Sequence, residues 1–101
     1  MTITQNDGVM TAHLTGEIDH HTAGYLRSAV DAVFVRTGPR ELILDFSGVS
    51  FMDSSGVGLA LGRYKKTREA GCTLVLAGLS DRDKRMMKLS GMQNMKGVEF
   101  R

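Results

Sequence analysis

Two short runs of polar side chains in this sequence could carry chemistry. One is Asp53-Ser54-Ser55, which separates an apolar run from a helical pattern. The other is Asp19-His20-His21, in which Asp19 can cap a helix. Oxygen side chains at a helix start accept hydrogen bonds from N–H groups that have no partner within the helix, and this end carries a partial positive charge. The helix start at residues 53–55 would therefore tolerate a phosphoryl group.

Other chemistries that use these residue types need spacings that the sequence lacks. A serine-hydrolase elbow needs G-x-S-x-G, which surrounds neither Ser54 nor Ser55, and a Walker-type phosphate loop is absent. The glycines of Gly56-Val57-Gly58 fall inside the expected helix rather than in the turn before it, and no ribose-binding acid follows the next strand, which counts against a dinucleotide site. Adjacent histidines 20 and 21 point in different directions and lack the further ligands of a zinc site. We expect no catalytic residue, no metal and no cofactor.

The apolar pattern around Asp53 predicts a strand followed by a helix. Leu42-Ile43-Leu44 is an unbroken apolar run, which suits a strand covered on both faces in the middle of a mostly parallel sheet. The helix begins near Asp53 or Ser54 and runs to about Ala70, with one apolar face formed by Val57, Ala60, Leu61 and Tyr64. Its charged residues are expected to form a solvated face: Arg63, Lys65, Lys66, Arg68 and Glu69.

The preceding segment predicts a hairpin and a first helix. Strands at residues 1–4 and 9–14 are joined through a turn that contains Asp7-Gly8. The second strand alternates, so that Met10, Ala12 and Leu14 face the core and His13 faces solvent. The helix runs from Asp19 to about Arg36 and ends at Gly38-Pro39, with a buried face formed by Leu26, Ala29, Val30 and Val33.

The last third of the chain repeats the alternation of strand and helix. Residues 73–77 read as an apolar strand, and Ser80 with Asp83 resembles a capping box that opens a helix ending at Gly91. Met86, Met87, Met92 and Met95 suit core filling, and residues 98–100 suit a last strand. Because a strand-helix-strand crossover joins parallel neighbours, the whole pattern predicts an α/β domain whose later strands are parallel.

Length and charge exclude several classes of protein. A chain of 101 residues with 42% apolar content suits one domain with one core. The 13 Lys and Arg residues against 11 Asp and Glu residues form no dense basic patch, so nucleic acid is not an expected partner. No run approaches the roughly 18 apolar residues of a membrane span, and the N-terminal residues lack the basic-then-apolar pattern of a signal peptide. We expect a cytoplasmic monomer in which the single Cys72 serves packing.

The sequence around Asp53 closely resembles a known family. Residues 51–58, Phe-Met-Asp-Ser-Ser-Gly-Val-Gly, and residues 61–65, Leu-Gly-Arg-Tyr-Lys, resemble the sporulation anti-sigma factor antagonists, which are built on the STAS domain. Residues 16–23 and 89–92 resemble two further family segments in the same order. The resemblance implies a STAS-like single domain over residues 1–101, with a mixed β-sheet and helices packed against it. Family members usually have a further helix after the last strand. Here we expect either that this helix is absent or that residues 92–101 pack differently.

The resemblance also implies a function without catalysis. In such relatives, the unphosphorylated antagonist binds an anti-sigma factor that is also a serine kinase, and thereby frees the sigma factor. Phosphorylation reverses this, and a PP2C-type phosphatase restores the active form. The acceptor is the serine directly after the aspartate, which is Ser54 here, although local sequence alone favours helix capping for both serines. The partner-binding surface comprises Asp19, His20, His21, Asp53, Ser54, Ser55 and Gly56.

Two other functions stay open at this point. The chain could be a STAS module of another regulatory assembly, or one that binds a nucleotide or anion at the same helix start. It could also be an enzyme that uses Ser54 or Asp53, which would need His20 or His21 as a general base within hydrogen-bond reach.

Overall fold

A two-stranded hairpin opens the fold in the computed structural model, which describes all 101 residues. Strand β1 (Thr2–Asn6) runs antiparallel to β2 (Val9–Ile18). The turn consists of Asp7 and Gly8, whose φ angles of 50° and 79° are the positive values that a tight hairpin turn requires. The predicted Asp-Gly turn is thus confirmed, and β1 extends past the expected end at residue 4 because the turn needs only these two residues.

The rest of the chain alternates helix and strand as predicted. The elements are α1 (His20–Thr37), β3 (Glu41–Met52), α2 (Ser54–Glu69), β4 (Thr73–Ala77), α3 (Asp81–Leu89), the 3₁₀ turn η1 (Met92–Asn94) and β5 (Val98–Phe100). The five strands form one sheet in the order β1-β2-β3-β4-β5, and every pair except β1–β2 is parallel. The expected α/β fold with a mixed sheet is confirmed.

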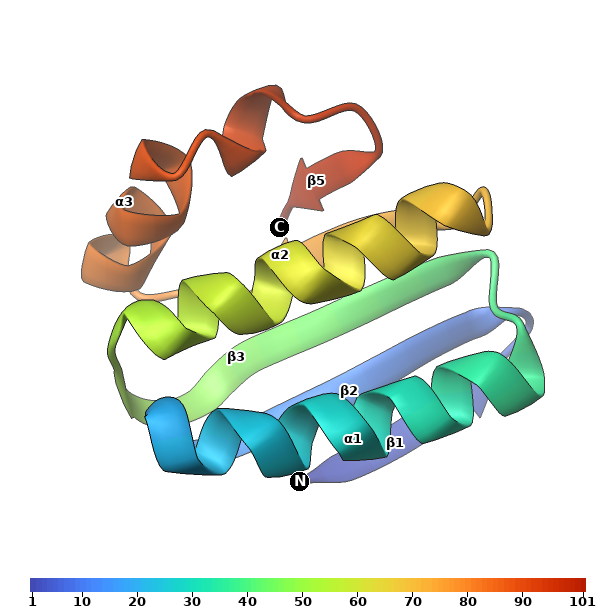
Figure 1. The fold of residues 1–101 in the computed structure, drawn as a ribbon, viewed down its shortest axis with the longest axis horizontal. Coiled ribbons are helices and arrows are strands. Elements are labelled where there is room, and N and C mark those ends of the chain that lie inside the picture. The colour runs from blue at the N-terminus through green and yellow to red at the C-terminus, as the bar shows by residue number, and fades with distance from the viewer.

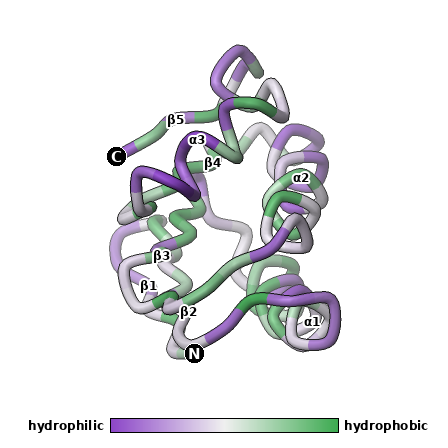
Figure 2. The backbone as a smooth tube through the Cα atoms, turned by 90° about the vertical axis from the view of Figure 1, so that its left-hand side faces the viewer, coloured by the Kyte–Doolittle hydropathy of each residue, from purple (hydrophilic) through white to green (hydrophobic).

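Helices α1 and α2 lie side by side on one face of this sheet (Figures 1 and 2). Alternate residues of the strands face these helices and are buried, as expected for Met10, Ala12 and Leu14 in β2. Helix α3 packs beside α2 and adds Met87 to the same core. The buried Cys72 also belongs to this core, which confirms its packing role.

Strand β3 lies in the middle of the sheet, but the prediction that Leu42-Ile43-Leu44 is covered on both faces is wrong. Leu42 and Leu44 are buried beneath the helices, whereas Ile43 is only partly buried on the opposite face. The reason is that α1 and α2 share one face of the sheet, so β3 alternates between core and surface. An apolar run three residues long cannot distinguish this arrangement from burial on both faces.

The prediction that Arg63 lies on a solvated face of α2 is also wrong. Its side chain is 4% exposed, and its Nε lies 2.8 Å from Oδ1 of Asp31 on α1. A guanidinium can be buried there because the facing carboxylate balances its charge. Burial nevertheless lowers the pKa of Arg63, an effect that nearby Arg27 increases and Asp31 opposes. This ion pair is one of the contacts that join α1 to α2.

Helix α1 buries Val30 and Phe34, so of the four residues predicted for its buried face only Val30 is fully buried, and Ala29 is only partly buried. Leu26 and Val33 pack against the core while partly exposed. Gly38 ends the helix with a φ of 55°, which confirms the predicted stop. No helix in the chain combines the length and apolar character needed to cross a membrane.

His13 lies on the sheet face opposite α1 and α2, as predicted. Its Nδ1 is 2.8 Å from Oδ2 of Asp45 on the neighbouring strand, and its side chain is 40% exposed. The Ser47 N–H donates to Asp45 at 3.0 Å. This hydrogen bond, together with the one to His13, lowers the pKa of Asp45. The pair ties β2 to β3 away from the two helix starts.

Candidate functional site

The fold brings together the two polar runs that the sequence singles out. Strands β2 and β3 are parallel neighbours whose last residues, Ile18 and Met52, are paired. The N–H of Asp53 donates to the carbonyl of Ile18 at 3.1 Å. Asp19 and Asp53 therefore follow two adjacent strands at the same edge of the sheet, and α1 and α2 start side by side.

The start of α1 is closed by a complete capping box. The Asp19 carboxylate accepts hydrogen bonds from the N–H groups of His21 and Thr22, each at 2.9 Å. The Asp19 N–H in turn donates to the Thr22 hydroxyl at 2.9 Å. The bond from the Thr22 N–H is the main cause that lowers the pKa of Asp19. Thr22 was missed as a site residue, although a threonine three positions after an aspartate cap is a recognisable signal.

The start of α2 is more open. Asp53 is the N-cap, and its carboxylate accepts one hydrogen bond, from the Ser55 N–H at 2.8 Å. Capping therefore falls to Asp53, and the capping role that local sequence favours for the two serines is wrong. Ser54 is the first residue of α2 and is exposed, and no protein group is hydrogen bonded to its hydroxyl. The site thus presents a free hydroxyl at a helix N-terminus.

Gly56 explains how the start of α2 fits over the core. It is buried, and a Cβ at this position would overlap the side chain of Met52, the last residue of β3. The absence of a side chain lets the first turn of α2 lie directly on Met52. Gly56 therefore positions Ser54 and is itself hidden from a partner, so it differs from the other expected surface residues.

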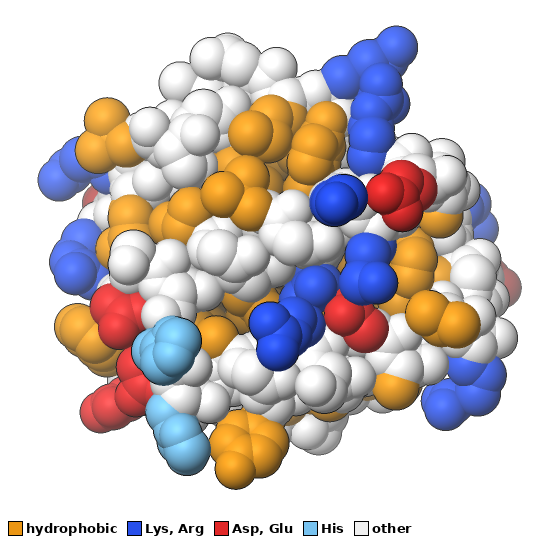
Figure 3. Space-filling view, viewed as in Figure 1, with side chains coloured by type: hydrophobic (Ala, Val, Ile, Leu, Met, Phe, Trp, Pro, Cys, Tyr) orange, Lys and Arg blue, Asp and Glu red, His pale blue; other side chains and the backbone are white.

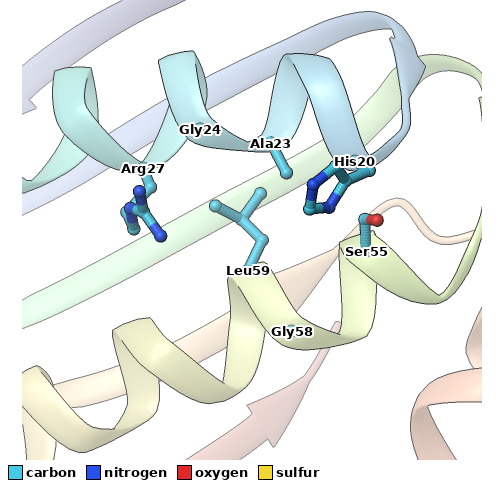
Figure 4. Close-up of a pocket in the computed structure, with 7 residues that line it drawn as sticks. All are labelled: His20, Ala23, Gly24, Arg27, Ser55, Gly58 and Leu59. Atoms are coloured by element: carbon cyan, nitrogen blue, oxygen red, sulfur yellow. The ribbon is translucent and has the colours of Figure 1, made fainter.

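A groove of about 430 Å³ lies between α1 and α2, next to these helix starts (Figure 4). His20 and Ser55 lie at one end, Arg27 lies at the other, and Leu59 points into the space between them. The complete lining consists of His20, Ala23, Gly24, Arg27, Ser55, Gly58 and Leu59. On the face of the molecule seen in Figure 3, histidine side chains lie at the left, and Lys and Arg side chains lie near the middle. We call this space the α1–α2 groove.

The side chains of the two histidines lie in different surroundings, as expected. His20 lines the α1–α2 groove, whereas the His21 ring packs edge-on against Tyr25 with 5.6 Å between ring centroids. Neither is hydrogen bonded to Ser54 or Asp53, so the structure does not show the base-to-hydroxyl contact of an activated serine. The Ser54 hydroxyl is exposed at the first position of α2.

Comparison with known proteins gives a consistent result. The STAS domain family model matches residues 1–99. The anti-sigma F factor antagonist of Paenibacillus polymyxa is 34% identical over 85 residues, which span 84% of this chain and 73% of that protein. The anti-sigma-B factor antagonist of Listeria monocytogenes is 38% identical over 82 residues, which span 81% of this chain and 71% of that protein.

The fold is also similar to that of the anti-sigma factor antagonist SpoIIAA, whose structure is known in two forms. The unphosphorylated form gives a TM-score of 0.82 at 26% identity, covering 99% of this chain and 86% of SpoIIAA. The phosphorylated form, from Bacillus, gives a TM-score of 0.77 at 26% identity, covering 99% of this chain and 89% of SpoIIAA. These relatives are anti-sigma factor antagonists, and the match of the family model to residues 1–99 shows that the chain belongs to the STAS domain family.

Proposed function

We propose that this protein is an anti-sigma factor antagonist that works by partner switching. Its unphosphorylated form binds an anti-sigma factor with serine kinase activity and so frees the sigma factor. Phosphorylation of Ser54 by that kinase ends the interaction, and a PP2C-type phosphatase restores it. The protein acts as a cytoplasmic monomer and is not itself an enzyme. The observation that carries this proposal is the exposed, unbonded hydroxyl of Ser54 at the first position of α2.

The partner-binding surface in this proposal comprises the two adjacent helix starts. Asp19, His20 and His21 come from α1 and its cap, and Asp53, Ser54 and Ser55 come from α2 and its cap. Their location at one edge of the sheet supports a single contact surface around the phosphorylation site. Gly56 contributes to this surface by holding the start of α2 against Met52.

Phosphorylation should leave the fold almost unchanged. A phosphate carrying about −1.5 to −2 charges at Ser54 is repelled by Asp53 and attracted by the N-terminus of α2, so the local effects partly cancel. The similarity of the chain to both forms of SpoIIAA supports this expectation. Amide NMR spectra of the two forms should differ only around His20 and Ser54. Shifts that extend through β4 and α3 would contradict it.

The switch should therefore act at the interface. A dianion that is buried in a protein contact without a matching cation costs several kcal/mol, and each 1.4 kcal/mol or so is a factor of ten in affinity. Phosphorylated protein should then bind the anti-sigma factor more weakly by orders of magnitude.

The test is calorimetric titration with purified anti-sigma factors encoded in the same genome. Wild type should bind one of them and displace its sigma factor. Ser54→Ala should bind equally well and resist inactivation by the kinase, whereas Ser54→Asp should bind more weakly. Ser50→Ala, which alters an exposed serine on β3, is the matched control and should behave as wild type. If no anti-sigma factor binds, while a nucleotide alone binds with high affinity, the proposal is wrong and the nucleotide-binding alternative stands.

A further inference from the structure

Two glycines that face the α1–α2 groove have no role in internal packing. Gly24 in α1 and Gly58 in α2 lie inside helices, where glycine is less stable than alanine. A Cβ at either position would meet no atom within 4 Å, and neither residue has a positive φ. Gly56 is different, because a side chain there would overlap Met52. The fold itself therefore does not require glycine at 24 or 58, where a side chain would narrow the groove.

The groove has an excess of positive charge. Arg27 lines one end, and no acidic residue lines the groove. Next to it, the Arg63 side chain is 4% exposed, and its Nη1 has no hydrogen-bond partner. Asp31 pairs with Arg63, and Arg27 forms no ion pair with any carboxylate of the chain. The other end of the groove adjoins the N-terminus of α2, where the Asp53 carboxylate that caps the helix offsets the partial positive charge, so the excess positive charge lies at the Arg27 end.

The middle of the groove is apolar and its surroundings suit a protein contact. Leu59 and Ala23 lie between the charged ends. On the adjoining surface Tyr25 is 68% exposed and contacts His21. Exposed tyrosine and arginine beside an apolar depression are typical of the residues that contribute most to protein interfaces. Walls formed by glycine would also let the main chain of a partner come close.

We propose that the α1–α2 groove receives a segment of the anti-sigma factor in which an acidic side chain pairs with Arg27 and an adjacent apolar side chain packs on Leu59. This inference rests on the proposed function. Ser54 lies next to the end of the groove formed by His20 and Ser55, opposite the Arg27 end, so a phosphate there adds negative charge to the same surface that the acidic segment must approach. A phosphate there repels the acidic segment without any change in the fold.

The decisive variant is Gly58→Ala, which adds one methyl group to the wall of the groove. It should weaken binding of the anti-sigma factor at least tenfold while raising the thermal midpoint, because alanine favours a helix. Gly62→Ala is the matched control, since it lies one turn further along α2, outside the groove, and also has no atom within 4 Å of the added Cβ. It should raise the thermal midpoint and leave binding unchanged.

Removal of the charge should have a separate signature. Arg27→Gln should weaken binding at least tenfold and make the remaining affinity less dependent on salt, because the lost contact is ionic. Wild-type affinity in both Gly58→Ala and Arg27→Gln would overturn the inference.

A second measurement does not depend on the anti-sigma factor. Amide NMR titration with N-acetyl-leucyl-glutamate amide should shift Gly24, Arg27 and Gly58 in wild type, and these shifts should be lost in Gly58→Ala. The glutamine analogue should cause much smaller shifts. If no anti-sigma factor binds wild type, the proposed function fails, and this titration still decides about the groove. If the glutamate compound causes no larger shifts than its glutamine analogue, the inference is overturned. It is also overturned if inorganic phosphate causes the same shifts at equal or lower concentration.

Discussion

The starts of α1 and α2 have the same origin in the fold but different chemistry. Each follows one of two adjacent parallel strands, and each has an aspartate as its N-cap. In α1 the third helical residue is Thr22, whose hydroxyl completes a capping box. In α2 the third residue is Gly56, which has no side chain to complete one. The difference shows that one helix start is built for stability, whereas the other leaves a serine free.

The sharpest way to test this comparison is to add a methyl group near each helix start. Gly56→Ala should lower the free energy of unfolding by about 1–3 kcal/mol, because the methyl group overlaps the fully buried Met52. Gly24→Ala in α1 should leave stability equal or higher, since nothing lies within 4 Å of the added atom. Urea denaturation measures the free energy of unfolding of both variants. Equal effects of the two substitutions would show that the starts are packed alike.

The second test removes the caps. Asp53→Ala should lower the free energy of unfolding by about 0.5–2 kcal/mol, the usual loss for one helix cap. Asp19→Ala should destabilise the protein more, because Asp19 accepts two backbone hydrogen bonds and belongs to a reciprocal box, whereas Asp53 accepts one. Thermal and urea unfolding of the two variants give the order directly. A larger loss for Asp53→Ala would contradict the assignment of α1 as the better-capped helix.

The smallest expected effect concerns pH. The pKa of Asp19 is lowered in the folded state, mainly by the Thr22 N–H, so its ionised form stabilises the protein above about pH 4. This contribution is lost as the pH falls through the lowered pKa. Asp19→Asn keeps a capping oxygen but cannot ionise, and should make stability less dependent on pH below about pH 4. Unfolding curves of both proteins at several pH values in this range test this prediction. The free energy of unfolding should fall more steeply with decreasing pH in wild type than in Asp19→Asn.

Most of the fold could be predicted from the sequence because its signals are local. The Asp7-Gly8 turn, the Asp19 cap and the stop at Gly38 each follow from residues close together in the chain. The errors concern long-range packing. Arg63 is buried because Asp31 faces it from another helix, and Ile43 is partly exposed because both helices lie on one face of the sheet. Neither fact is encoded within a short window of sequence.

The candidate site was predicted in position but not in detail. The residues following β2 and β3 do come together, as a parallel sheet requires. The sequence could not show that Asp53 rather than a serine caps α2, or that Gly56 lies buried on Met52. It also gave no signal for the α1–α2 groove, because Gly24, Arg27 and Gly58 become neighbours only when the two helices pack together.

The central claim is that Ser54 is the residue through which a kinase controls this protein. The direct measurement is incubation with the anti-sigma factor kinase that binds wild type, in the presence of ATP, followed by mass spectrometry of the modified peptide. The account predicts a single phosphate on Ser54 and none on the Ser54→Ala variant. A phosphate on Ser55 or elsewhere, or equal phosphorylation of Ser54→Ala, would contradict it.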